Sequence, residues 1–176
     1  MQFDLVYEKL LAELFNTKQS SEWIFHDGAF HTILEGPNGI TYMLNLASYW
    51  EMDLPAEAFN VKEMSPEQWK TLKHGTWHVE FGSEESKEQT EITGEQGMSS
   101  SKVFSLIGNA LLNKVKEQPK VFKNLAFSAK EPSRRSLYAR LAPLLAKKLN
   151  KDVVVSDDGS WFFIVAKPAE RIIGNN

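Results

Sequence analysis

The sequence predicts an α+β fold with helices packed on a mixed, mostly antiparallel sheet, and three observations support it. Apolar residues recur at helical spacing in three segments, 3–15, 103–115 and 137–149. Short β-rich segments are separated by Asp-Gly and Pro-Asn-Gly, which are typical of hairpins because glycine adopts the positive φ that these turns need. The last third of the chain predicts the order strand, helix, strand, helix, strand, strand.

The first part of the chain, residues 1–75, predicts a helix followed by an antiparallel meander. The amphipathic helix covers 3–15 and ends in the polar run at 16–21. Strands are expected at 23–25, 30–34 and 40–46. Beyond them, the only regular element expected before residue 76 is a short helix at 66–72.

The second part, residues 76–166, is the better organised. Trp77, Val79 and Phe81 alternate with polar residues, which predicts a half-buried strand. A polar, acidic stretch follows, either a loop or a hairpin. The remaining expected elements are a helix from Ser99–Ser101 to Pro119, a strand at 121–129, a helix from Pro132 or Ser133 to Leu149 kinked at Pro143, and a hairpin of 153–155 with 161–165. We expect one domain over 1–176, with a tail at 167–176.

Composition limits the class of protein. The 176 residues are 42% hydrophobic and 24% charged, as in ordinary soluble globular proteins. The chain has no cysteine, which excludes disulfides, a thiolate nucleophile and cysteine-ligated zinc. No window approaches the roughly 18 apolar residues of a membrane span, and the N-terminus lacks a signal-peptide pattern. We therefore expect a cytoplasmic protein.

The net charge of −3 conceals an asymmetry. Residues 1–100 carry 6 Lys and 17 acidic residues, a balance of −11, whereas residues 101–176 carry 14 basic and 6 acidic residues, a balance of +8. The basic half could solvate its own helices, bind a phosphorylated cofactor or contact an acidic protein. We expect no nucleic-acid partner, because the pI is about 5.8 and the basic residues form no dense run.

The four histidines predict structural or surface roles rather than a metal site. His74 and His78 are four apart, but the pattern predicts a strand entry there, where that spacing spans about 13 Å. His26 and His31 flank a hairpin turn without a carboxylate cluster nearby in sequence. The chain also lacks the Gly-x-Ser-x-Gly, Walker and Gly-x-Gly-x-x-Gly motifs of hydrolases and nucleotide-binding proteins.

A glycine-containing loop precedes the helix that begins near residue 100. Gly94 and Gly97 would let backbone amides approach a phosphate, and Ser99 lies at the helix start, where the helix dipole favours anions. The alternative is a mobile loop with a serine cap. Glu95 favours this alternative, because a carboxylate beside a pyrophosphate is unfavourable.

Residues 127–138 carry the most specific pattern in the chain. A strand ends, a helix begins, and Arg134, Arg135 and Tyr138 lie on its first turns. Arginines at a helix start do not complement the helix dipole, which favours contact with an anion, and Tyr138 could donate a proton in a cleft. The alternative is an ordinary capped junction with Tyr138 half-buried.

Three features together carry a resemblance over residues 76–166. They are the glycine loop before Val103-Phe104, the run Leu125–Ala129, and Pro132-Ser133-Arg134 with Leu137-Tyr138. This combination resembles a diffuse group of uncharacterised tailed-bacteriophage proteins. The order of elements is also similar to the core of the GNAT acyltransferases.

The GNAT resemblance implies a binding mode for coenzyme A. In that family a glycine loop and the following helix hold the cofactor's pyrophosphate, and an Asn-x-x-Ala-x-x-Leu-Tyr helix supplies a tyrosine acid. Leu137-Tyr138 matches the Leu-Tyr pair. The chain departs from the family's Gln/Arg-x-x-Gly-x-Gly/Ala loop, since Met98 and Ser99 follow Gly97, and it has Ser133 and Arg134 in place of Asn and a small residue.

Two functions are therefore expected. The first is a phage accessory protein on a degenerate acyltransferase-like scaffold, without cofactor or catalysis, that binds a host or virion protein in the infected bacterial cytoplasm or in the virion. The alternative is an N-acyltransferase that moves an acetyl group from acetyl-CoA to an amine. Its expected site residues are Tyr138 as acid, Glu80 as base, and Gly94, Gly97, Ser99, Arg134 and Arg135 for the cofactor.

Overall fold

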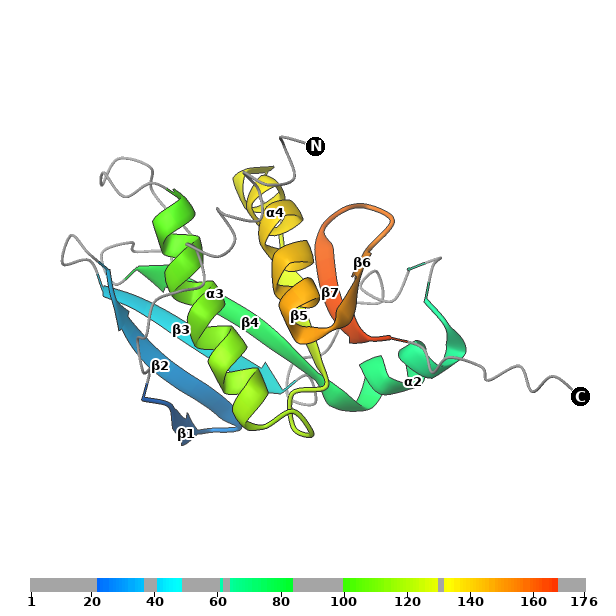
Figure 1. Cartoon of the computed structure of the whole chain (residues 1–176), viewed down its shortest axis with the longest axis horizontal. Coiled ribbons are helices and arrows are strands. Elements are labelled where there is room, and N and C mark those ends of the chain that lie inside the picture. Colours follow the sequence, from blue (N-terminus) through cyan, green and yellow to red (C-terminus); the bar gives the residue numbers. More distant parts are fainter. Residues whose placement is uncertain are drawn as a thin grey trace, which may run out of the picture.

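A seven-stranded sheet with the order β1-β2-β3-β4-β5-β7-β6 organises the structure (Figure 1). The computed structural model describes residues 22–36, 41–48, 61, 64–83, 100–129 and 132–167. The expected opening helix, the glycine loop and the C-terminal tail lie outside these residues. The elements are β1 (Ile24–His26), β2 (Ala29–Glu35), β3 (Thr41–Ser48), α2 (Pro66–Gly75), β4 (Thr76–Ser83), α3 (Ser100–Glu117), β5 (Asn124–Ser128), α4 (Pro132–Leu149), β6 (Lys151–Val155) and β7 (Trp161–Ala166).

The α+β class and the β-α-β-α-β-β order of the second part are confirmed. All neighbouring strands pair antiparallel except β4 and β5, which are parallel and are connected through α3. The pairing of β3 with β4 joins the predicted meander and the predicted core into one sheet.

The first hairpin follows from its Asp-Gly turn. Asp27 and Gly28 have φ of 48° and 74°, so both adopt the left-handed conformation of a two-residue hairpin turn. Asparagine, aspartate and glycine tolerate this conformation better than other residues. The turn places Ile24 opposite His31, and the β2–β3 pairing then continues the register to Asn45.

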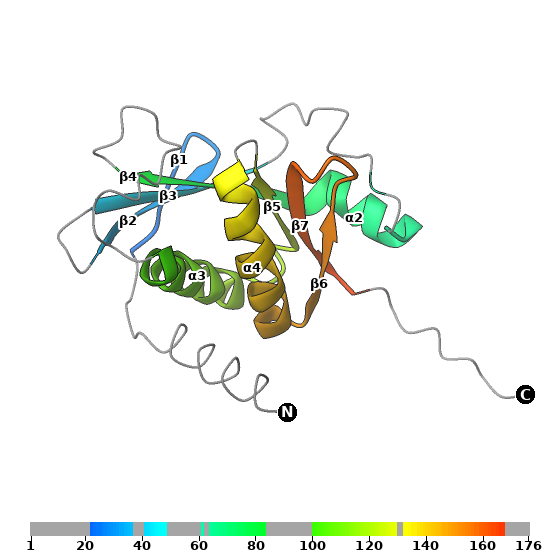
Figure 2. The ribbon, with the colours of Figure 1, turned by 90° about the horizontal axis from the view of Figure 1, so that it is seen from above.

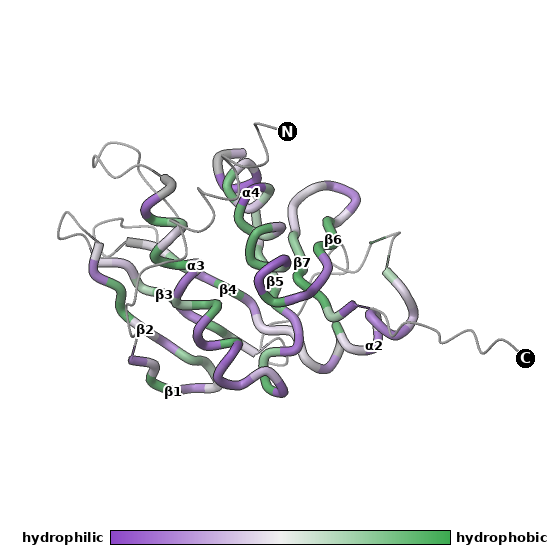
Figure 3. Tube along the Cα trace, in the orientation of Figure 1, coloured by the Kyte–Doolittle hydropathy of each residue, from purple (hydrophilic) through white to green (hydrophobic). Residues whose placement is uncertain are grey.

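Helices α3 and α4 lie next to each other on one face of the sheet (Figure 2). The predicted alternation in β4 is confirmed, because Trp77, Val79 and Phe81 pack into the core on this face. Helix α2 packs on the opposite face, over β5, β7 and β6. Strand β7 therefore has helices on both sides, which accounts for its continuous apolar run (Figure 3).

Helix α2 begins at a capping box and extends three residues past the predicted end. Ser65 accepts a hydrogen bond from the Gln68 backbone, and the Gln68 side chain accepts one from the Ser65 backbone. At the other end, the Thr76 hydroxyl donates to the Leu72 carbonyl oxygen. As a result His74 lies in the last turn of α2 and not at a strand entry, which corrects the sequence interpretation.

Helix α4 continues through Pro143, the position of the predicted kink, and the proline lies on its exposed side. No helix in the described part of the chain combines the length and apolar character required to cross a membrane.

Candidate functional site

Tyr138 lies in the core between α4 and the sheet. It is buried, and its ring centroid is 6.0 Å from that of Phe81, 5.2 Å from Phe127 and 6.1 Å from Phe162. These three rings come from β4, β5 and β7, so the tyrosine packs against three strands at once. The structure thus places Tyr138 among aromatic side chains on the helix-covered face of the sheet.

Glu80 lies on the opposite face. It neighbours Phe81 on β4, and successive side chains of a strand point to opposite faces. Its Oε1 is 3.2 Å from Nδ1 of the buried His78, and this contact, opposed by partial burial, lowers the pKa of the Glu80 carboxyl. The structure therefore does not bring Glu80 together with Tyr138; the sheet separates them.

The two predicted arginines have different surroundings. Arg134 is buried, with its guanidinium 5.6 Å from the centroid of the Phe81 ring, so it lies on the same side of the sheet as Tyr138. Arg135 is exposed, and its Nε donates a hydrogen bond of 3.1 Å to the Ala129 carbonyl oxygen. Gly94, Gly97 and Ser99 lie outside the described residues.

The parallel strands β4 and β5 diverge towards their carboxyl ends (Figure 1). Their pairing ends at Val79 and Phe127, whereas β4 continues to Ser83. Tyr138 contacts Phe127, the last paired residue of β5, and Phe81, which follows the last paired residue of β4. Its ring therefore lies on the helix side of the place where the two strands separate. In open α/β sheets the carboxyl ends of parallel strands are where ligands usually bind.

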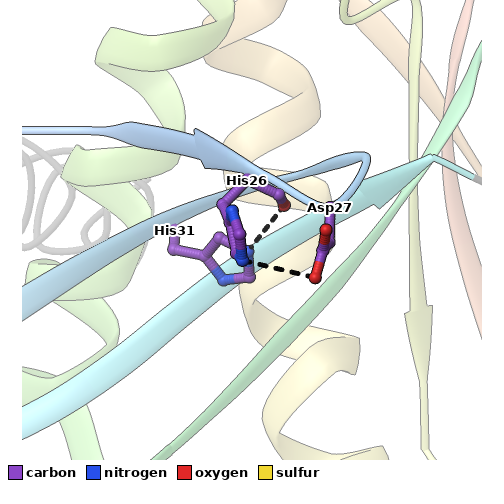
Figure 4. A network of polar contacts seen from close by, with 3 residues as sticks. All are labelled: His26, Asp27 and His31. Carbon is purple, nitrogen blue, oxygen red and sulfur yellow. Dashed lines mark hydrogen bonds and ion pairs between the residues drawn. The ribbon is translucent and has the colours of Figure 1, made fainter.

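A polar network on the second face of β1–β3 was not anticipated from the sequence. His31 Nδ1 lies 2.8 Å from Asn45 Oδ1, and its Nε2 donates to the His26 carbonyl oxygen at 3.2 Å. His26 Nε2 is in turn 3.3 Å from Asp27 Oδ2 (Figure 4). Asn45 is opposite Glu80 in the β3–β4 register, so the two side chains lie on the same face of the sheet.

Exposed apolar side chains share this face. Ile24 is opposite His31 in the register and 65% exposed, and Ile33, two residues along β2, is 61% exposed. Among the described helices, α2 alone packs on this side, and it covers β5, β7 and β6 instead. We call the part of this surface that no described helix covers the open face; its residues are Ile24, His31, Ile33, Met43, Asn45 and Glu80.

The strands that form the open face are also one-sided in charge. Residues 22–36, 41–48 and 76–83 contain no Lys or Arg. Their acidic residues are Glu22, Asp27, Glu35 and Glu80. The hairpin turn and the alternation in β2 can be recognised in the sequence. That the acidic and apolar residues lie on one face depends on the register of the four strands β1 to β4.

The described residues contain no group of three His, Asp or Glu side chains arranged to hold a metal ion. No protein-family model, curated protein or solved structure matches the chain.

Proposed function

We propose that the protein is a non-catalytic accessory protein that binds another protein through the open face. In line with the resemblance to tailed-bacteriophage proteins, the partner is a host factor or a virion component. The observation that carries the proposal is the pair of exposed isoleucines, Ile24 and Ile33, on neighbouring strands of a face that α2 leaves uncovered.

The open face has two features that favour binding of a protein: exposed apolar side chains and a polar side chain held in place by hydrogen bonds. Ile24 and Ile33 would each gain about 1 to 2 kcal/mol on losing their exposed apolar area to a partner. Between them, the ring of His31 is held by two hydrogen bonds. Side chains fixed in this way lose little conformational entropy on binding, which favours association.

The negative charge of the open face indicates a partner with a positively charged surface. The strands of the open face carry two acidic residues, Glu35 and Glu80, and no Lys or Arg, and Glu22 and Asp27 lie just outside them. A partner surface with exposed apolar side chains surrounded by Lys and Arg would be complementary, and the opposite charges would also accelerate the encounter.

The position of the expected acid and base supports a function without catalysis. An acid and a base that act on one reaction must both come within hydrogen-bond distance of the reacting atoms or of one bridging water. Tyr138 is enclosed by aromatic rings on the helix-covered face, whereas Glu80 contacts His78 on the other.

The proposal is tested by partner capture from lysates of infected bacteria, with two matched variants. Ile33→Lys places a cation on the open face and should abolish capture of the partner that the wild type retains. Val155→Lys makes the same change at an exposed valine on β6, at the far edge of the sheet, and should leave capture intact. Equal capture by both variants would reject the open face as the interface.

The second candidate is an N-acyltransferase that uses acetyl-CoA. The divergence of β4 and β5, with Arg134 and Tyr138 beside it, favours this function. Calorimetric titration with acetyl-CoA tests it. Micromolar binding, together with acetyl transfer that is lost in Tyr138→Phe, would support the enzyme. Absence of binding at millimolar acetyl-CoA would reject it.

A further inference from the structure

Lysines from separate parts of the sequence gather at the end of the molecule where α3 and α4 terminate. Lys116 is in the last turn of α3, and Lys147 and Lys148 are in the last turn of α4. Lys120 and Lys123 are exposed in the loop that follows α3. The Lys151 ammonium donates to the Lys123 carbonyl oxygen, which fixes the end of α4 beside that loop. We call these six lysines the lysine end.

Basic residues outnumber acidic residues in the segments that carry the lysine end. Residues 100–129 and 132–152 contain eleven Lys and Arg residues and two acidic residues, Glu117 and Asp152. Among the described residues, Lys116, Lys120 and Lys123 form no ion pair with another side chain. Partial burial lowers the pKa of the Lys151 ammonium.

Aromatic rings lie next to the lysine end. The Trp77 indole donates a 3.0 Å hydrogen bond to the Val121 carbonyl oxygen, so its ring lies against the loop that carries Lys120 and Lys123. Phe25 is 60% exposed and packs 4.8 Å from Phe30. The Lys114 ammonium is 4.5 Å from the Phe30 ring, which places the β1–β2 hairpin beside the end of α3.

We propose that the lysine end and its neighbouring rings bind single-stranded nucleic acid. The lysines would contact phosphates, while an unpaired base stacks on the exposed ring of Phe25. Lysine-lined grooves with exposed rings recur in proteins that bind single strands, because every base presents a π-face. A duplex keeps its bases stacked internally, whereas a single strand offers free bases to the exposed Phe25 ring.

This site is separate from the open face and does not depend on the proposed function. The sequence alone argued against nucleic acid, since no dense basic run exists and the pI is about 5.8. The fold alters that argument, because it brings the ends of two helices and the loop after α3 together.

The test is fluorescence anisotropy of the full chain with a labelled oligo-dT of about 15 nucleotides, at about 50 and 200 mM salt. Lys116→Ala with Lys120→Ala should weaken binding about tenfold at the lower salt. The slope of log affinity against log salt should fall by about 1.4, since each lost phosphate contact on a single strand contributes roughly 0.7. The control, Lys70→Ala with Lys102→Ala, changes the net charge equally away from the lysine end and should alter affinity less than about twofold.

The aromatic contribution is tested with Phe25→Leu, which keeps an apolar side chain and removes the ring. Affinity should fall about fivefold to tenfold with the salt slope unchanged, because base stacking releases no counterions. Three results would overturn the proposal. They are no binding at the lower salt, equal weakening by both lysine pairs, or competition by poly-L-glutamate as effective as unlabelled oligo-dT with no effect of Phe25→Leu. The last would indicate an acidic protein partner.

Discussion

Leu34 and Ile33 are adjacent in β2, yet Leu34 is 4% exposed and Ile33 is 61% exposed. The difference arises because α3 and α4 cover one face of the sheet from β2 across to β7, whereas α2 covers only the half formed by β5, β7 and β6 on the other. Since side chains alternate, the same strands can supply the core with one set of residues and present another set to a partner. Substitutions on the two faces should therefore have separable effects.

The largest effect is expected where the helix-covered face is most tightly packed. Phe127 is fully buried, and its ring centroid is 5.2 Å from that of Tyr138. Phe127→Ala should reduce the free energy of unfolding by about 3 to 5 kcal/mol, through lost apolar burial and the cavity that remains. Urea denaturation followed by circular dichroism measures this. A loss below about 1 kcal/mol would mean that Tyr138 does not pack as a core residue.

The two faces are compared most directly by substituting Leu34 and Ile33, which are neighbours in β2. Leu34→Ala should cost about 2 to 4 kcal/mol, whereas Ile33→Ala should change stability by less than about 1 kcal/mol. Both are measured by urea denaturation. Under the proposed function, Ile33→Ala should nevertheless weaken partner capture. Equal destabilisation by the two substitutions would show that the second face of β2 is part of a packed core.

A third test concerns helix α2, which covers half of the second face of the sheet. Ser65 caps this helix through a hydrogen bond from the Gln68 backbone, so Ser65→Ala should cost about 1 kcal/mol. The control is Ser136→Ala, an exposed position within α4, where little change is expected. Thermal unfolding compares the two variants. If they unfold at the same temperature, docking of α2 does not depend on its cap.

The sequence predicted most of the fold because its local signals agree with one another. The Asp27-Gly28 turn, the alternation through Val79 and the apolar face of α3 each indicate an element independently of the others. The end of α2 was placed three residues too early, since the helix continues to Gly75, where the Thr76 hydroxyl donates to the Leu72 carbonyl oxygen. The polar residues Lys73 and His74 carry no apolar periodicity, so spacing alone does not reveal this last turn.

The candidate sites were harder to predict because they depend on strand register. Tyr138 and Glu80 were predicted to act as acid and base from their residue types. Because side chains alternate along a strand, Glu80 lies on the face opposite to its neighbour Phe81, and therefore opposite to Tyr138. The contact between His31 and Asn45 joins residues 14 positions apart, and its detection requires the pairing of β2 with β3. Parity within a predicted strand was available from the sequence and would have separated Glu80 from the helix-covered face.

The smallest expected effect concerns the Glu80–His78 pair on the second face. The contact with His78 lowers the pKa of the Glu80 carboxyl below its ordinary value of 4.5, so the native state favours the ionised form more than the unfolded state does. Its contribution to stability is therefore present above that ordinary value and is lost as the pH falls through the lower native value. Because the Glu80 side chain is 46% exposed, the contribution should stay below about 1 kcal/mol.

Urea denaturation of the wild type and Glu80→Gln, from neutral pH to about pH 3, tests this linkage. The stability difference between them should be constant near neutral pH and should shrink on acidification, because the protonated wild-type carboxyl then resembles the amide. Repeating the pair in a His78→Phe background removes the cause of the shift, so the pH-dependent part of the difference should disappear. If it persists there, a group other than His78 stabilises the ionised carboxyl of Glu80.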